Sequence, residues 1–272
     1  MKITIIGAGN MGGAVARALV CSHCCHDAGS CAHRAGNEIR PSDITCTARS
    51  QDTLQKFEQA GFNVTLDNRA AVAQADIVIF AVKPWLMEGV VRDVAPYMDL
   101  SRQIVTSVAA GISFEQLTGW LGGSPAMFRI IPNTAIEVGS GVTFISLCNA
   151  SSDQRSMILD MFSRMGYALE VEESMMAAGT ALASCGIAYA MKYIQASAAG
   201  GETLGFSPEQ ARKIVEYTAK GAAELLLATG AEPQTEIDKV TTPGGMTQKG
   251  LAAMEDAGFS QAVADGLDAC LK

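Results

Sequence analysis

Histidine is scarce in this chain and an excess of basic charge is absent. The 272 residues include three histidines, all between positions 23 and 33, so none lies deeper in the chain to act as a general base. Dehydrogenases that use histidine to move an alcohol proton are therefore disfavoured. The formal net charge of −8 provides no basic surface for nucleic acid or an anionic membrane. No apolar run approaches the roughly 20 residues that span a bilayer.

A secretory signal and a disulfide framework are also not expected. The N-terminus enters a strand-like run at once, which leaves no room for the regions of a signal peptide. Eight cysteines in a chain without an export signal favour reduced thiols in a cytoplasmic protein. Four of them lie with the three histidines between residues 21 and 36, where Cys21 and Cys24 have zinc-like spacing. This segment lacks two well-separated ligand pairs, so we expect an exposed loop and no metal site.

The most informative sequence that is present lies at residues 2–13. The apolar run Ile3–Ile6 leads into Gly7-Ala8-Gly9-Asn10-Met11-Gly12, and an alanine-rich segment with helical spacing follows. A strand, a glycine turn and a helix form the context in which G-x-G-x-x-G indicates a dinucleotide site. Gly7 permits the tight turn, Gly9 admits a pyrophosphate and Gly12 lets the helix pack closely. Free N–H groups at the helix start then face the phosphate charge.

The first half of the chain alternates strand-like and helix-like segments, as a doubly wound α/β sheet requires. Strand-like runs occur at residues 44–48, 63–66, 76–82, 103–108, 128–131 and 141–147. Ligands of such sheets bind beyond the carboxyl ends of the strands. Four segments should therefore surround one crevice: Gly7–Gly12, Arg49-Ser50, Lys83-Pro84 and Ala109–Gly111.

The end of the second strand favours NADPH over NADH. An NAD site generally carries a carboxylate there that binds the ribose 2′-hydroxyl. This chain has Arg49 and Ser50 instead, and its next carboxylate is Asp52. A guanidinium and a hydroxyl suit a 2′-phosphate, which a carboxylate would repel. NADH remains possible if Arg49 is a solvated surface residue.

The second half has a different character. After residue 170 the strand patterns end, and alanine-rich helical patterns begin. Residues 174–199 are predicted to form a buried central helix, and a further helix begins at Ser207-Pro208 and stops at Gly230. We place a dinucleotide-binding Rossmann domain at residues 1–170 and an all-helical domain at 171–272. Because helices alone leave much apolar surface uncovered, the second domain is expected to dimerise.

A short loop in this half could bind an anion. Val240–Thr247 reads Val-Thr-Thr-Pro-Gly-Gly-Met-Thr and precedes a helix that runs to about residue 256. Small residues with exposed N–H groups at a helix start form a natural carboxylate pocket. Alone, a Pro-Gly-Gly turn is weak evidence for such a site.

Together, several motifs resemble those of the pyrroline-5-carboxylate reductase family, in the same order over nearly the whole chain. They are Gly7–Gly13, Asp67-Asn68, Ala81–Pro84, Ser107–Gly111, Pro132–Thr134 and Val240–Thr247. The resemblance implies NAD(P)H-dependent reduction of the cyclic imine 1-pyrroline-5-carboxylate to L-proline. It also implies an N-terminal Rossmann domain and a helical C-terminal domain that forms homodimers or larger homo-oligomers.

The resemblance also assigns site residues. The implied cofactor contacts are Gly7, Ala8, Gly9, Asn10, Met11, Arg49, Ser50, Asn68, Ala81, Val82, Lys83, Pro84, Val108, Ala109 and Ala110. The implied substrate contacts are Glu173, Thr242, Pro243, Gly244, Gly245, Met246 and Thr247. Thr247 matches the catalytic threonine that hydrogen-bonds the substrate. The N–H groups of Gly245–Thr247 are expected to hold its carboxylate.

The chain departs from the family pattern at three short motifs and by the extra cysteine- and histidine-rich insertion at 21–36. The usual Ser-Gly-Ser-Gly-Pro-Ala-Tyr is Ala183-Ser184-Cys185-Gly186-Ile187-Ala188-Tyr189 here. Ala135 replaces a usual proline, and Met246 replaces a usual threonine or alanine in the substrate loop. Of these changes, Cys185 and Met246 bear on the identity of the substrate more than on the chemistry.

Two other functions remain as alternatives. One is a related imino-acid or β-hydroxyacid-type reductase. β-Hydroxyacid dehydrogenases need a lysine one helical turn after a Gly-x-Gly, whereas Lys192 lies six residues after Gly186. The other is a non-catalytic NADPH-binding regulatory protein, supported only by the altered stretch Cys185–Ile187.

Overall fold

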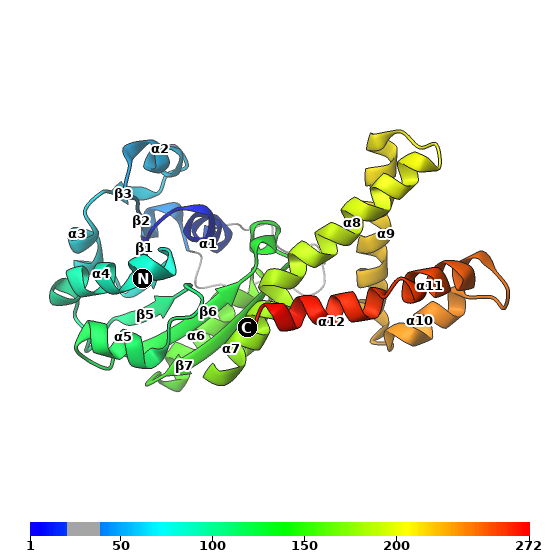
Figure 1. Ribbon diagram of the computed structural model, residues 1–272. Helices are drawn as coiled ribbons and strands as arrows, with labels where there is room; N and C mark the ends of the chain where they lie inside the picture. The colour runs from blue at the N-terminus through cyan, green and yellow to red at the C-terminus, as the bar shows by residue number, and fades with distance from the viewer. Residues whose placement is uncertain (21–38) are drawn as a thin grey trace. The chain divides into compact units, whose positions relative to one another are not determined.

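The computed structural model describes residues 1–20 and 39–272 (Figure 1). The cysteine- and histidine-rich segment expected to be a loop at 21–36 lies outside the described residues. The chain divides into two compact units, Met1–Ser184 and Cys185–Lys272.

The first unit is built on one eight-stranded sheet, with strand order β3-β2-β1-β4-β5-β6-β7-β8. The strands are β1 (Ile3–Ile6), β2 (Ile44–Thr47), β3 (Asn63–Thr65), β4 (Ile77–Phe80), β5 (Ile104–Ser107), β6 (Ala126–Pro132), β7 (Gly141–Cys148) and β8 (Gly166–Glu170). All neighbours are parallel except β6 and β7, which pair antiparallel. The carboxyl ends of β3, β2, β1, β4 and β5 therefore meet at one edge of the sheet.

Apolar residues cover both faces of this sheet. Ile77 and Ile79 pack into one cluster with helices α1, α2 and α6, while Val78 and Phe80 pack into another with α3, α4 and α5. The six helices are α1 (Asn10–Val20), α2 (Gln51–Gln59), α3 (Asn68–Ala73), α4 (Pro84–Val94), α5 (Phe114–Leu121) and α6 (Ser152–Ser163). Because strand side chains alternate between faces, the continuous apolar runs are buried on both sides. The predicted doubly wound α/β fold is confirmed.

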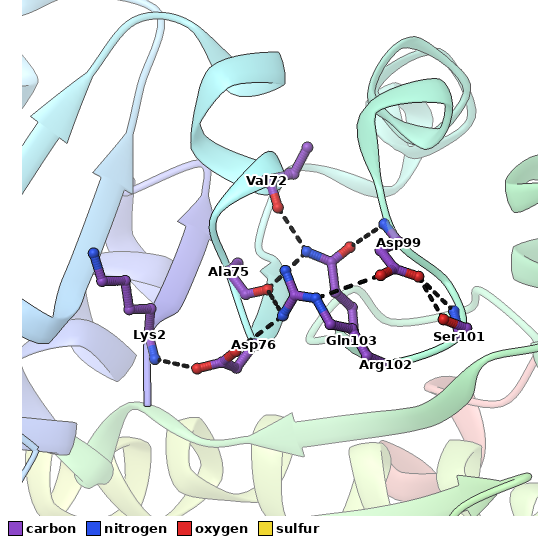
Figure 2. Close-up of polar contacts among 8 residues, drawn as sticks. All are labelled: Lys2, Val72, Ala75, Asp76, Asp99, Ser101, Arg102 and Gln103. Carbon is purple, nitrogen blue, oxygen red and sulfur yellow. Dashed lines mark hydrogen bonds and ion pairs between the residues drawn. The ribbon is translucent and has the colours of Figure 1, made fainter.

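The amino-terminal edge of the sheet is closed by polar contacts (Figure 2). Gln103, just before β5, is buried, and its amide donates to the carbonyls of Val72 and Ala75, each at 2.7 Å. Its side-chain oxygen accepts from the N–H of Asp99 at 2.9 Å. Every hydrogen-bonding group of the Gln103 amide thus has a partner, which a buried amide requires. This edge has a structural role, and the ligand edge lies opposite.

The second unit is helical, as predicted. It comprises α8 (Gly186–Thr203), α9 (Pro208–Thr229), α10 (Pro233–Val240), α11 (Met246–Asp256) and α12 (Phe259–Ala269). Ser207 caps α9 by accepting from the N–H of Gln210 at 3.3 Å, and Gly230 ends that helix with a φ of 62°. Both predicted ends of α9 are confirmed.

The expected buried central helix differs in two ways. Residues 173–203 divide into a 3₁₀ turn at Glu173–Met175, a short helix α7 (Met176–Gly179), a π-helical stretch at Thr180–Cys185, and α8. Within the described chain, Ala198 is the one buried residue of α8. The helix presents Met191 and Tyr193 to solvent instead.

This helical stretch also corrects the expectation that no apolar segment is long enough to span a bilayer. Among the described residues, Glu173–Thr203 is long and apolar enough to cross a membrane by length and composition alone. Large apolar side chains are also exposed on later helices, including Leu204, Tyr217 and Leu227. A single copy of the chain therefore leaves much of the apolar surface of this unit uncovered.

Candidate active site

The glycine turn at the end of β1 is shaped by close backbone contacts. Gly7 has a φ of 94°, and a Cβ there would lie 2.7 Å from Cγ1 of Val82. A Cβ on Gly12 would lie 2.3 Å from the carbonyl oxygen of Gly7, so only glycine lets α1 pack this closely. A Cβ on Gly9 would meet nothing within 4 Å. Gly9 is therefore glycine for a reason outside the packing of this chain, such as the approach of a ligand.

Helix α1 offers free donors next to Gly9. The N–H groups of Gly7 and Ala8 donate to the carbonyl of Thr47 at 3.1 and 2.7 Å, and that of Gly9 donates to Gly7 at 2.8 Å. Among the described residues, the N–H groups of Asn10, Met11 and Gly12 have no partner. Three unpaired N–H groups at a helix start fit a pyrophosphate.

Arg49 and Ser50 follow β2 at the same edge and are exposed. Ser50 precedes α2, and its hydroxyl lies 2.9 Å from that of Thr53. No acidic side chain pairs with Arg49 within the described residues, so its guanidinium is available to an anionic ligand. This arrangement fits a 2′-phosphate.

Asn68 and the turns after β4 and β5 complete the edge. Asn68 begins α3, which Asp67 caps by accepting from two N–H groups. Lys83 and Pro84 are exposed at the start of α4, while Ala81 and Val82 are half-buried beside the glycine turn. Val108 and Ala109 are buried and Ala110 is exposed, so Val108 and Ala109 shape the floor of this edge. The fold thus brings all the predicted cofactor residues to one edge of the sheet.

Glu173 lies in the same unit, where Arg129 and the start of α5 hold it. Nη1 of Arg129 and the N–H of Phe114 donate to Oε1 of Glu173 at 2.7 and 2.8 Å. Arg129 is buried, and its Nε has no partner among the described residues. In the register of β5 and β6, Arg129 lies opposite Ser107, the last residue of β5. The Arg129–Glu173 ion pair therefore lies near the ligand edge.

Sequence reasoning missed Arg129. The available signal was a lone charged residue in the apolar run Met127–Ile131. A buried charge needs a partner, which the sequence alone did not identify.

The predicted substrate loop belongs to the second unit. Gly244 has a φ of 73°, and its N–H donates to Oε1 of Gln248 at 2.6 Å. The N–H of Gly245 donates to the carbonyl of Thr242 at 2.9 Å. This contact corrects the expectation that Gly245 offers its N–H to a ligand, because that donor is already used.

The remaining donors of the loop lie at the start of α11. Among the described residues, the N–H groups of Met246, Thr247 and Gln248 and the hydroxyl of Thr247 have no partner. Met246 is 91% exposed, and Thr242 and Pro243 are exposed as well. The loop therefore presents three backbone donors and one hydroxyl, a set that suits a carboxylate.

Two family profiles match the chain. The profile described as "Pyrroline-5-carboxylate reductase dimerisation" matches residues 173–272. The profile "NADP oxidoreductase coenzyme F420-dependent" matches residues 2–111.

Curated relatives extend over the whole chain. A pyrroline-5-carboxylate reductase of Arabidopsis thaliana is 31% identical over 100% of this chain and 93% of its own length. Pyrroline-5-carboxylate reductase 1 of Dictyostelium discoideum is 33% identical over 97% of this chain. The chain spans about half of that second relative, 48% of its length.

Solved structures agree with the sequences. A pyrroline carboxylate reductase of Plasmodium falciparum with NADP bound is 25% identical, covers 100% of this chain and 95% of its own, and has a TM-score of 0.86. The Coxiella burnetii pyrroline-5-carboxylate reductase is 28% identical, covers 99% and 96%, and has a TM-score of 0.85. On this evidence the chain belongs to the pyrroline-5-carboxylate reductase family.

Proposed function

We propose that this chain reduces 1-pyrroline-5-carboxylate to L-proline with NADPH, a step of proline biosynthesis. The observation that carries the proposal is the family relationship over nearly the whole chain. Two helix starts with unpaired N–H groups, on α1 and on α11, supply the separate anion sites that a dinucleotide and an imino acid need.

The nucleotide occupies the carboxyl edge of the sheet. Asn10, Met11 and Gly12 bind the pyrophosphate through their N–H groups, while the open space at Gly9 admits it. Arg49 and Ser50 bind the 2′-phosphate, which favours NADPH, although NADH is still accepted more weakly. The other nucleotide contacts are Gly7, Ala8, Asn68, Ala81, Val82, Lys83, Pro84, Val108, Ala109 and Ala110. When bound, the nicotinamide supplies the hydride that adds to the carbon of the C=N bond.

The substrate is held by the loop before α11. The N–H groups of Met246, Thr247 and Gln248 bind its carboxylate, and the hydroxyl of Thr247 orients the ring nitrogen. Gly244 and Gly245 shape the turn through their contacts with Gln248 and Thr242. Thr242 and Pro243 belong to the same loop, and the family resemblance adds Glu173 to the substrate contacts. Because the imine nitrogen is already protonated, catalysis depends mainly on orientation and needs no histidine.

The two domains divide these tasks. Residues 1–170 bind the nucleotide, and residues 171–272 bind the substrate and form the subunit contact. The exposed apolar side chains of α8–α12 are covered by a second copy in a homodimer or larger homo-oligomer, rather than by a membrane. The enzyme acts in the cytoplasm and requires no metal or nucleic acid.

The test is a spectrophotometric assay of NADPH oxidation with 1-pyrroline-5-carboxylate, with chemical identification of L-proline as product. A β-hydroxyacid and a linear imino acid serve as comparison substrates. We expect turnover with the cyclic imine only. NADPH binding without turnover on any of the three substrates would instead support the regulatory alternative.

A further inference from the structure

Two cysteines and a tyrosine form a cluster within the helical unit. Cys185 directly precedes α8 and is half-buried, whereas Cys270 follows α12 and is exposed. Cys185 lies one helical turn before Tyr189, and the neighbouring Cys270 contributes, after burial, to a raised pKa of the Cys185 thiol. The Tyr189 hydroxyl, one turn further along α8, lies 2.8 Å from Sγ of Cys270 and 3.0 Å from the carbonyl oxygen of Gly266. Residues 81 positions apart in sequence, Tyr189 and Cys270, are thus in direct contact.

The tyrosine is a neutral hydrogen-bond donor at physiological pH. Its contact with Cys270, and secondarily its burial, raise the pKa of Tyr189 to about 12. When Cys270 is a thiol, it can donate to the phenol oxygen while the phenol donates to Gly266. When Cys270 is a thiolate, the phenol can donate to the sulfur instead. The cluster can therefore accommodate both states of Cys270.

We propose that Cys185 and Cys270 form a reversible disulfide, with a small-molecule disulfide of the glutathione type as the oxidant. Cys185 stands where the motif that the chain resembles usually has serine. Tyr189, one turn after Cys185 on α8, contacts Cys270 directly, and Cys270 caps the carboxyl end of α12, where its side chain is exposed. Only a small local movement is then needed to bring the sulfurs to bonding distance.

The exchange proceeds in two balanced steps. The exposed Cys270 thiolate attacks one sulfur of the oxidant, so that a mixed disulfide forms and the first oxidant thiolate leaves. The Cys185 thiolate then attacks Sγ of Cys270, the protein disulfide forms and the second thiolate leaves. The protein loses two protons and two electrons, and the oxidant is reduced to two thiols. Burial, followed by the proximity of Cys270, raises the pKa of the Cys185 thiol, so the second step requires Cys185 to lose its proton first.

The disulfide would close a loop that contains most of the helical unit, from residue 185 to residue 270. A crosslink between such distant residues restricts the unfolded chain and so stabilises the folded unit. It would also protect Cys270 from irreversible oxidation beyond the sulfenic acid. The pair thereby makes the stability of the helical unit depend on the thiol redox state.

The experiment treats the full-length enzyme with oxidised glutathione and maps its disulfides by mass spectrometry under non-reducing conditions. The four cysteines at positions 21–31 are first changed to serine to remove competing thiols. We expect one crosslinked peptide pair that joins residues 185 and 270, a higher Tm, and reversal of both by dithiothreitol. Cys46 should remain reduced, because burial raises the pKa of its thiol to about 12.

Cys185→Ser and Cys148→Ser are the matched variants. Cys185→Ser should leave Cys270 carrying stable glutathione, whereas Cys148→Ser, on β7, should leave the crosslink unchanged. The proposal is overturned if Cys270 keeps glutathione while Cys185 stays free, or if Cys270 crosslinks to a second subunit. A lower Tm after crosslinking would overturn the stabilising role. These readouts do not depend on catalytic activity.

Discussion

The Arg129 guanidinium donates to the Glu173 carboxylate at 2.7 Å, and it joins a strand of the sheet to the start of the region that matches the dimerisation profile. The N–H of Phe114, at the start of α5, donates to the same carboxylate oxygen. Arg129 is buried, while 38% of the Glu173 side chain is exposed. Glu173 therefore compensates a charge that the sheet cannot leave unpaired.

Replacing Glu173 by alanine should destabilise the protein. The change leaves the Arg129 charge buried without its partner and removes the acceptor of the Phe114 N–H. We expect a loss of about 1–3 kcal/mol in the free energy of unfolding, measured by urea denaturation. The partial exposure of Glu173 keeps the loss below that of a fully buried pair. Glu172→Ala, an exposed neighbour, is the control, and equal losses from both variants would exclude the ion pair as the cause.

Substitutions at Gly9 and Gly12, in the turn after β1, should separate an effect on nucleotide binding from an effect on folding. Gly9→Ala should leave the Tm unchanged, because the new methyl group meets no protein atom within 4 Å, but it should weaken NADPH binding about tenfold or more. Gly12→Ala should lower the Tm itself, because its Cβ would clash with the carbonyl of Gly7. Calorimetric titration and thermal denaturation measure the two effects. Gly89→Ala, also in open space but on α4, is the control for the binding effect and should leave NADPH affinity unchanged.

The nucleotide domain could be predicted in detail because its signals are local. A few adjacent residues are enough to recognise the Gly7–Gly12 turn and the buried runs of β4 and β5. The same holds for the end of β2, where Arg49 stands and a carboxylate is missing. The antiparallel direction of β7 could not, because the alternation of side chains is the same for either direction.

Long-range pairings were also beyond the sequence. Arg129 and Glu173 lie 44 residues apart, and neither one's neighbours indicate the other. In the substrate loop, the Pro-Gly-Gly turn could be recognised from the sequence. The hydrogen bond from the N–H of Gly245 to the carbonyl of Thr242 could not. The prediction that α8 is buried was wrong, because composition does not tell whether the same chain or a second copy covers an apolar helix.

Removing the guanidinium of Arg49 should discriminate between the two nicotinamide cofactors. Arg49→Ala is expected to raise KM for NADPH about tenfold or more, the value of one hydrogen bond between charged groups, and to leave KM for NADH nearly unchanged. Steady-state kinetics with each cofactor measure this difference. Arg40→Ala, which removes another exposed arginine, should change neither KM. A similar rise for both cofactors with Arg49→Ala would reject a contact with the 2′-phosphate.

Thr247 should contribute through its hydroxyl rather than its methyl group. Thr247→Ala is expected to lower kcat/KM for the imine about tenfold, because one oriented donor is lost, while Thr247→Ser keeps most of the activity. NADPH affinity should be the same in both variants. Unchanged kinetics in Thr247→Ala would contradict its catalytic assignment, and an equal loss in Thr247→Ser would point to packing instead.

Gly245 and Gly250 provide a matched test of the substrate loop, because both lie near the start of α11 but differ in their surroundings. A Cβ on Gly245 would lie 2.3 Å from Oγ1 of Thr242, so Gly245→Ala must displace the turn that presents the N–H groups of Met246 and Thr247. We expect KM for the imine to rise about tenfold, with no change in KM for NADPH. A Cβ on Gly250 meets nothing within 4 Å inside the helix, so Gly250→Ala should stabilise the protein by about 0.5–1 kcal/mol and leave both KM values unchanged. If the two variants gave the same kinetics, the shape of this turn would have no role in substrate binding, and the carboxylate would have to bind elsewhere.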